Sequence, residues 1–130
     1  MTRHYSHAWL LIGLLLPAMA LASPIGPIKN IAVAETGIGP KAESCSAFSV
    51  TQDQARAFFE KAVLISGAQQ HDFFLYGPCS ARGTLETRYG VWNWEIRNMG
   101  TGSITAANGD TFLLGDPAQE SSLGDDSLEP

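Results

Sequence analysis

Strict alternation of apolar and polar residues over residues 80–97 constrains the fold more than any other feature. The two runs SARGTLETRY and VWNWEIR alternate with a period of two, which is the period of side chains along a β-strand. One face then carries Trp92, Trp94 and Ile96, while the other is mainly polar. Because a slip of one residue would exchange the faces, we expect an antiparallel sheet with one buried side. We expect both tryptophans to be core side chains rather than an aromatic ligand platform.

The polar face of this sheet is the predicted partner-binding surface. Tyr89-Gly90 between the two runs predicts a two-residue hairpin turn. In that register Arg82 faces Arg97, which is unfavourable unless a carboxylate or an anion lies between the two guanidinium groups. The candidate partner-binding residues of this face are Arg82, Arg88, Glu95 and Arg97. A solvated face that binds nothing is the alternative.

Two shorter runs rich in β-forming residues follow, GSITA and TFLLG. Asn108-Gly109 between them predicts a second hairpin, because both residues tolerate a positive φ. The sequence Gly100-Thr101-Gly102 predicts a mobile turn, which adds Thr101 to the candidate partner-binding residues. A phosphate-binding role is not expected here, since a dinucleotide-binding fingerprint follows a strand and opens a helix.

Residues 52–66 predict a helix that covers the apolar face of the sheet. Thr51 and Gln54 have the spacing of a capping box, and apolar residues then recur at helical spacing. Gly67 stands where a helix usually ends. The preceding run CSAFSV, residues 45–50, predicts a first strand. The expected fold is α+β, with one helix packed on a four- to five-stranded antiparallel sheet.

The N-terminal residues predict an exported protein. Arg3, the apolar run after it and a small-residue site ending at Ala22 predict a signal peptide over residues 1–22. Its apolar stretch of fifteen residues is shorter than the ~20 residues that a transmembrane helix needs. We therefore expect a periplasmic or secreted protein with no transmembrane anchor after signal cleavage.

Composition divides the rest of the chain into a linker, one domain and a tail. Residues 23–43 contain three prolines and three glycines and predict a flexible linker, followed by a small α+β domain over residues 44–115. Residues 116–130 predict an acidic disordered tail, which holds five of the thirteen acidic residues. The domain is nearly neutral, with five basic and six acidic residues, so no nucleic-acid partner is expected.

Cys45 and Cys79 predict one disulfide bond, because an even number of cysteines in an oxidising compartment usually pairs. Two free thiols or a metal pair are the alternatives. A zinc site is not expected, since the chain after signal cleavage has a single histidine to add to the two cysteines. The disulfide would close a loop of about 35 residues and contribute about 3–4 kcal/mol to the free energy of unfolding.

His71-Asp72 is the only neighbouring pair of a histidine and a carboxylate after the signal peptide. A hydrolase needs a nucleophile held by such a base, and the sequence contains neither a G-x-S-x-G nor an H-E-x-x-H motif. We therefore predict no catalytic residue, no metal and no cofactor. The apolar run of residues 73–76 that follows lies under the helix or forms an exposed partner site.

Three segments, CSAFSVTQDQARAFFEKA, GPCSARGTL and WNWEIRNMGTGSI, resemble a family of small exported proteins of Gram-negative bacteria. The similarity covers residues 45–115 and lies in the order and spacing of these motifs. It implies a periplasmic location and the disulfide, and it implies no activity. We expect a non-enzymatic binding or interaction module whose partner is a periplasmic protein or an envelope component. The alternatives are a small hydrolase-like enzyme that uses His71 and Asp72, or a purely structural envelope protein.

Overall fold

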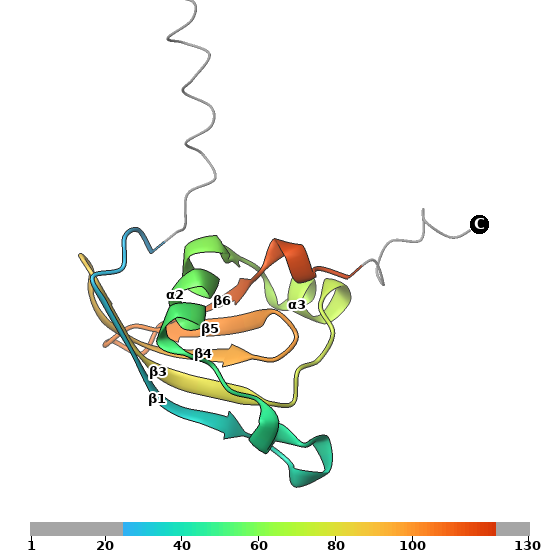
Figure 1. Ribbon diagram of the computed structural model, residues 1–130. Helices are drawn as coiled ribbons and strands as arrows, with labels where there is room; N and C mark the ends of the chain where they lie inside the picture. The colour runs from blue at the N-terminus through green and yellow to red at the C-terminus, as the bar shows by residue number, and fades with distance from the viewer. Residues whose placement is uncertain (1–24, 122–130) are drawn as a thin grey trace, which may run out of the picture.

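The computed structural model describes residues 25–121 and shows a twisted antiparallel sheet with helices packed on it (Figure 1). The strands are β1 (Asn30–Ile38), β2 (Val63–Leu64), β3 (Ser80–Thr87), β4 (Gly90–Arg97), β5 (Thr101–Thr105) and β6 (Thr111–Gly115). They lie in the order β1-β3-β4-β5-β6-β2. The helices are α2 (Gln52–Lys61) and α3 (Gly67–Phe73), with three short 3-10 helices, η3 (Lys41–Glu43), η4 (Cys45–Ala47) and η5 (Pro117–Gln119).

The α+β class is confirmed, but the sheet within the described residues has six strands instead of the predicted four to five. The predicted signal peptide, residues 1–22, lies outside the described range, as do residues 122–130 of the predicted tail. The tail prediction is wrong at its start, because residues 117–119 form η5. No helix within the described range is long and apolar enough to cross a membrane.

Helix α2 packs on one face of the sheet and builds the core with it. Its residues Ala55 and Phe59 are buried, and the Phe59 ring lies 5.7 Å from the ring of Trp94. Trp94 and Ile96 are buried, so both are core side chains as predicted. Trp92 is half-buried at the rim of the core. Burial of the large aromatic side chains under α2 accounts for much of the stability, at about 1.5–3 kcal/mol for each fully buried ring.

The predicted helix over residues 52–66 is wrong beyond Lys61. The capping box at its start is present, since the Thr51 hydroxyl accepts the Gln54 N–H at 3.1 Å. At Ala62, however, ψ is 146°, and the chain leaves the helical region. The next two residues form the edge strand β2 because their backbone pairs with β6. This pairing partner lies some fifty residues further along the chain, which helical spacing alone does not reveal.

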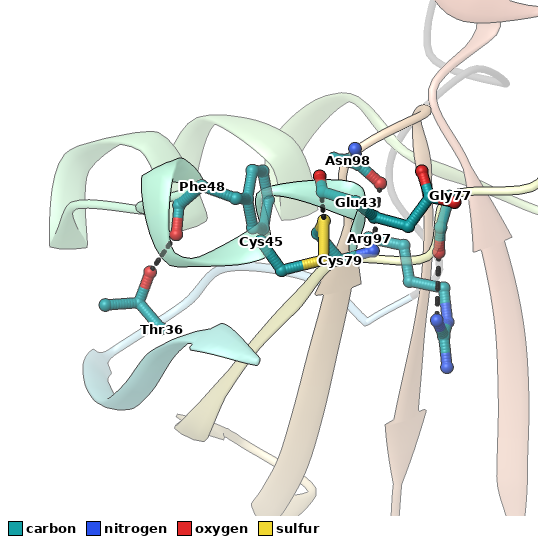
Figure 2. Close-up of a disulfide and its surroundings, with 8 residues drawn as sticks. All are labelled: Thr36, Glu43, Cys45, Phe48, Gly77, Cys79, Arg97 and Asn98. Carbon is teal, nitrogen blue, oxygen red and sulfur yellow. Dashed lines mark hydrogen bonds between the residues drawn. A yellow bond between two sulfur atoms is a disulfide. The ribbon is translucent and has the colours of Figure 1, made fainter. Parts of the chain in front are cut away.

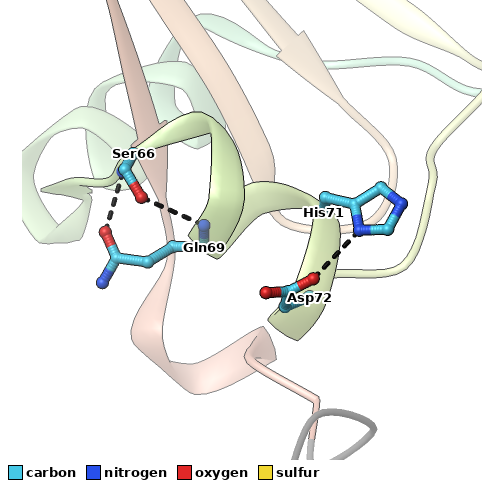
Figure 3. Close-up of polar contacts among 4 residues, drawn as sticks. All are labelled: Ser66, Gln69, His71 and Asp72. Atoms are coloured by element: carbon cyan, nitrogen blue, oxygen red, sulfur yellow. Dashed lines mark hydrogen bonds and ion pairs between the residues drawn. The ribbon is translucent and has the colours of Figure 1, made fainter.

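A second capping box begins α3. The Ser66 hydroxyl accepts the Gln69 N–H at 3.0 Å, and the Gln69 side chain accepts the Ser66 N–H at 2.8 Å (Figure 3). Gly67 therefore lies in the first turn of a new helix. The prediction that Gly67 ends the preceding helix is wrong.

The linker prediction for residues 23–43 is wrong over Asn30–Ile38, because these residues form β1 and pair with β3 at the edge of the sheet. The predicted first strand over residues 45–50 is also wrong, since its first three residues form η4. Thr36 holds the connection against β1: its hydroxyl donates to the Phe48 carbonyl oxygen at 2.9 Å (Figure 2). The segment therefore lies beside the sheet without joining it.

The β3–β4 hairpin turns at Arg88-Tyr89, one residue earlier than predicted, and Thr87 pairs with Gly90. Gly90 has a φ of +114°, a value that residues with a side chain rarely adopt. The hairpin predicted at Asn108-Gly109 is present between β5 and β6, but its loop spans residues 106–110, and of the two residues only Gly109 has a positive φ, of +96°.

This turn shifts the predicted pairing by two residues, which leaves each side chain on its predicted face but changes its partner across the strands. Arg82 faces Glu95 instead of Arg97. The predicted pair of opposed arginines is therefore wrong, and the polar face contains no like-charge contact that would need an anion to relieve it.

The predicted disulfide is present between Cys45 and Cys79, whose Cα atoms are 5.0 Å apart (Figure 2). Both cysteines are buried. The bond joins η4, just before α2, to the residue before β3. Gly39 packs directly against it, since a Cβ at Gly39 would lie 2.5 Å from the Cys45 sulfur. The ends of three segments therefore meet at one bond.

Replacing both cysteines, Cys45→Ala and Cys79→Ala, should lower the free energy of unfolding by about 3–4 kcal/mol, because the unfolded chain loses a closed loop of about 35 residues. Urea denaturation followed by tryptophan fluorescence measures the change. Reduced wild-type protein is the matched control and should unfold at a similar urea concentration. An unchanged unfolding midpoint in the double variant would contradict the prediction.

Candidate functional site

The sheet face opposite α2 is polar in the structure. Arg82 faces Glu95, and Glu95 faces Ser103 on the next strand. At the β1 edge, Arg82 forms an ion pair with Glu35 at 2.7 Å, and both side chains are more than half exposed. Exposed ion pairs of this kind contribute little to stability. Arg82 is therefore a solvated residue of the open part of the face.

Helix α3 and the segment after it cover the other part of the polar face. Phe74 is buried and packs on β6, because a Cβ at Gly115 would lie 2.5 Å from the Phe74 ring. A Cβ at Gly102, which points to the other face, would instead lie 2.9 Å from the Phe58 ring of α2. The two helices therefore pack on opposite sides of the sheet. The edge of α3 forms a wall over the polar face.

A groove with a volume of about 510 Å³ lies beside this wall, and we call it the α3 groove. It is lined by residues of α3, of the segment after α3 and of the β4–β5 end of the sheet, namely Gln70, His71, Phe74, Leu75, Tyr76, Gly77, Arg97 and Thr101. A smaller depression of about 50 Å³ shares Gln70, Arg97 and Thr101 with the groove and adds Glu95 and Ser103 to the lining. The groove combines apolar and hydrogen-bonding groups, as binding sites commonly do.

Arg97 is the centre of the α3 groove. Its Nη1 donates to the Gly77 carbonyl oxygen at 2.9 Å, and its Nε lies 3.2 Å from Glu95 Oε1. Its guanidinium carbon lies 5.7 Å from the centroid of the Tyr76 ring. These three contacts hold an arginine side chain that is only 31% exposed, and the pre-ordered side chain loses little entropy when a partner binds.

The apolar wall of the groove is unusually open to solvent. Tyr76 is 78% exposed and Leu75 is 46% exposed. Phe74 is buried, but on the sheet face opposite α2, so the prediction that the run of residues 73–76 lies under that helix is wrong. Leu75 and Tyr76 are exposed, as in the other alternative, and a partner at this site stays a prediction.

His71 lies on α3, in the lining of the groove. Its side chain is 89% exposed, and its Nδ1 is 3.0 Å from Asp72 Oδ1 (Figure 3). Within residues 25–121 no hydroxyl group forms a hydrogen bond with His71. The same residues contain no cluster of three or more His, Cys, Asp or Glu side chains that could hold a metal ion. The histidine thus has an orienting carboxylate but no nucleophile within hydrogen-bond reach.

The predicted partner-binding residues separate into two groups. Glu95, Arg97 and Thr101 come together at the groove. Thr101 is 3% exposed and lies in the floor of the groove, and its role as a contact residue stays a prediction. Arg82 lies one strand away, and Arg88 lies at the other end of the β3–β4 hairpin, where its guanidinium packs 5.0 Å from the centroid of the Tyr89 ring.

The predicted mobile loop at residues 100–102 is also wrong, because Thr101 and Gly102 begin β5 and all three residues are buried. Glycine is needed at position 100 and at position 102 for different physical reasons. Gly100 has a φ of +87°, which favours glycine in the turn. Gly102 leaves room for α2, since a Cβ there would lie 2.7 Å from the Glu95 carbonyl oxygen and 2.9 Å from Phe58.

Gln70 was not predicted, because the predicted helix ended at Ser66 and α3 was not expected. Leu75 and Tyr76 belong to the run of residues 73–76, for which an exposed partner site was one of the two alternatives. The pair Ser66 and Gln69 has the spacing of a capping box and would have predicted α3.

Comparisons with protein-family models, with curated proteins and with solved structures found no match to this chain.

Gly102→Ala should lower the free energy of unfolding by about 1–3 kcal/mol, because the added methyl group would be forced against Phe58 and the β4 backbone. Thermal or urea denaturation measures the difference from the wild-type protein. Gly67→Ala is the matched control: its Cβ would meet open space in the first turn of α3, and it should stabilise by about 0.4–1 kcal/mol or leave stability unchanged. Equal stability of the two variants would contradict this packing role.

Proposed function

We propose that this protein is a non-enzymatic binding module of the cell envelope, periplasmic or secreted, and that it binds a protein partner through the α3 groove. The signal-peptide pattern of residues 1–22 supports export. The buried Cys45–Cys79 bond supports it as well, because disulfides of this kind are typical of oxidising compartments. A purely structural envelope protein would have no need of a groove with pre-ordered polar groups.

The observation that carries the proposal is the exposed ring of Tyr76 beside Arg97. Tyrosine and arginine are the residues most enriched, with tryptophan, among those that dominate binding energy at protein interfaces. Tyr76 offers a large amphipathic surface with few rotatable bonds, so ordering it on binding costs little entropy. The neighbouring Leu75 extends this surface with an exposed apolar side chain.

The charged and apolar groups of the groove indicate which chemical groups the partner should carry. Glu95 offsets part of the positive charge of Arg97, while the Nη2 group of Arg97 has no acceptor among the described residues. The partner should therefore supply an oxygen acceptor to Arg97 and an apolar side chain to the Tyr76–Leu75 surface. An extended protein segment provides both groups on successive residues.

A photoreactive phenylalanine analogue at position 76 should cross-link to the partner in cells, because this ring faces the proposed interface. The same analogue at position 89 is the control: Tyr89 is 62% exposed and also packs on an arginine, but it lies at the far end of the hairpin. The cross-linked product is identified by mass spectrometry. Equal cross-linking from the two positions would overturn the proposed site.

With the partner purified, Tyr76→Ala should raise its dissociation constant at least ~10-fold, as removal of a dominant interface side chain does. Tyr89→Ala should change the constant less than ~2-fold. Isothermal titration calorimetry gives both values. A Tyr76→Ala protein that binds as tightly as the wild type would exclude Tyr76 from the interface.

A hydrolase-like function is the second candidate, since His71 and Thr101 line the same groove. With a binding role only, the wild-type protein should hydrolyse p-nitrophenyl acetate no faster than an equal concentration of N-acetylhistidine, because no hydroxyl within the described range is hydrogen-bonded to the imidazole. A spectrophotometric assay measures the rate. A wild-type rate well above that of N-acetylhistidine, lost in Thr101→Val, would favour the enzyme instead.

A further inference from the structure

A second cavity, with a volume of about 300 Å³, lies on the α2 side of the sheet. Its floor is apolar and includes Val50, Phe58 and Ile96. The rim is polar and includes Gln54 and Lys61 of α2, Asn98 of the β4–β5 turn, and Asp116 before η5. It is close to the lower end of the range of small-molecule pockets, roughly 300–1,000 Å³, so a guest must be small.

The walls of this cavity are held in place by hydrogen bonds. Asn98 Oδ1 accepts the Cys79 N–H at 3.2 Å, and the Asn98 N–H donates to the Cys79 carbonyl oxygen at 3.0 Å (Figure 2). This ties the turn to the residue that forms the disulfide. The Asp116 N–H donates to the Gly100 carbonyl oxygen at 2.8 Å, which ties the third wall to the same turn. A pocket ordered in this way needs little rearrangement to bind a guest.

Three charged residues line the cavity, Lys61, Arg97 and Asp116, and of these Arg97 is already paired with Glu95. Within residues 25–121 Lys61 forms no ion pair, although it shares the cavity with Asp116. Asp116 Oδ1 accepts the Ala118 N–H at 3.0 Å, and its second carboxylate oxygen has no partner in the same range. The side-chain amide nitrogens of Gln54 and Asn98 also lack an acceptor there, since only their oxygens are engaged. The rim thus offers a cation, an anion and two neutral donors.

We propose that this cavity binds a free apolar amino acid in its zwitterionic form. The carboxylate of the guest pairs with the Lys61 ammonium group, its ammonium group pairs with Asp116, and its side chain covers the apolar floor at Phe58. An internal polypeptide segment made of apolar residues carries neither of these charges, so it does not satisfy this rim. The site lies on the opposite side of the sheet from the α3 groove and does not depend on the function proposed for that groove.

Titration of the purified, disulfide-intact protein with L-phenylalanine, followed by amide NMR, tests the proposal. The amides of residues 98–100 and of the last turn of α2 should shift. N-acetyl-L-phenylalanine lacks the ammonium group and L-phenylalaninamide lacks the carboxylate, so each should bind roughly tenfold more weakly, as expected for the loss of one charge-assisted contact. No shift at these amides up to about 10 mM L-phenylalanine, or equal affinity for the three compounds, would overturn the proposal.

Two conservative variants test which rim residue pairs with which charged group of the bound amino acid. Lys61→Gln should bind L-phenylalanine and its amide alike, and Asp116→Asn, which keeps Oδ1 for the Ala118 N–H, should bind L-phenylalanine and its N-acetyl derivative alike. Lys41→Gln, at an exposed lysine of η3, is the matched control and should bind as the wild type does. Tyr76→Ala should also retain wild-type affinity for L-phenylalanine, which separates this site from the α3 groove. The assignment is refuted if Lys61→Gln still binds L-phenylalanine more tightly than its amide, or if Asp116→Asn still binds L-phenylalanine more tightly than its N-acetyl derivative.

Discussion

The Cys45–Cys79 disulfide is the covalent junction on which the arrangement of the whole fold depends. It joins the start of the α2 segment to the start of β3, and Gly39 at the end of β1 packs against its sulfur. Asn98 hydrogen-bonds to the backbone of Cys79, so the β4–β5 turn is held at the same point. Two residues before Cys79, the Gly77 carbonyl oxygen accepts a hydrogen bond from Arg97. In a small domain with a limited core, one buried crosslink therefore positions both the groove and the cavity.

The two faces of the sheet have different roles because different helices pack on them. Helix α2 excludes water from one face with Phe59, while α3 covers only part of the other and leaves a polar surface with an aromatic edge. The edges of the sheet are poor sites for a partner strand. At β1 the Gln52 side chain donates to the Ile31 carbonyl oxygen at 2.9 Å, and β2 has only two residues. Binding is therefore expected on faces and cavities rather than by strand addition.

The sequence predicted those features that depend on contacts between near neighbours or on composition. The capping box at Thr51, the hairpin at Asn108-Gly109 and the pairing of two cysteines all belong to this group. Features that depend on distant pairing were missed: β1, β2 and the break between the two helices each exist because a strand elsewhere in the chain supplies backbone partners. Of the candidate site, Glu95 and Arg97 were predicted from alternation, and Tyr76 belonged to an apolar run that the sequence left either buried or exposed. The position of α3 decided that Tyr76 is exposed.

The sequence by itself determined which side chains share a face of the sheet. Alternation has a period of two, so the two-residue shift in the β3–β4 pairing left Trp94 in the core and Arg97 on the polar side. Only the tertiary structure decided which of these side chains meet. That Arg82 faces Glu95 depends on where the turn forms, and that Tyr76 lies against Arg97 depends on the packing of Phe74 over Gly115. Such contacts join segments far apart in the chain, and local periodicity carries no information about them.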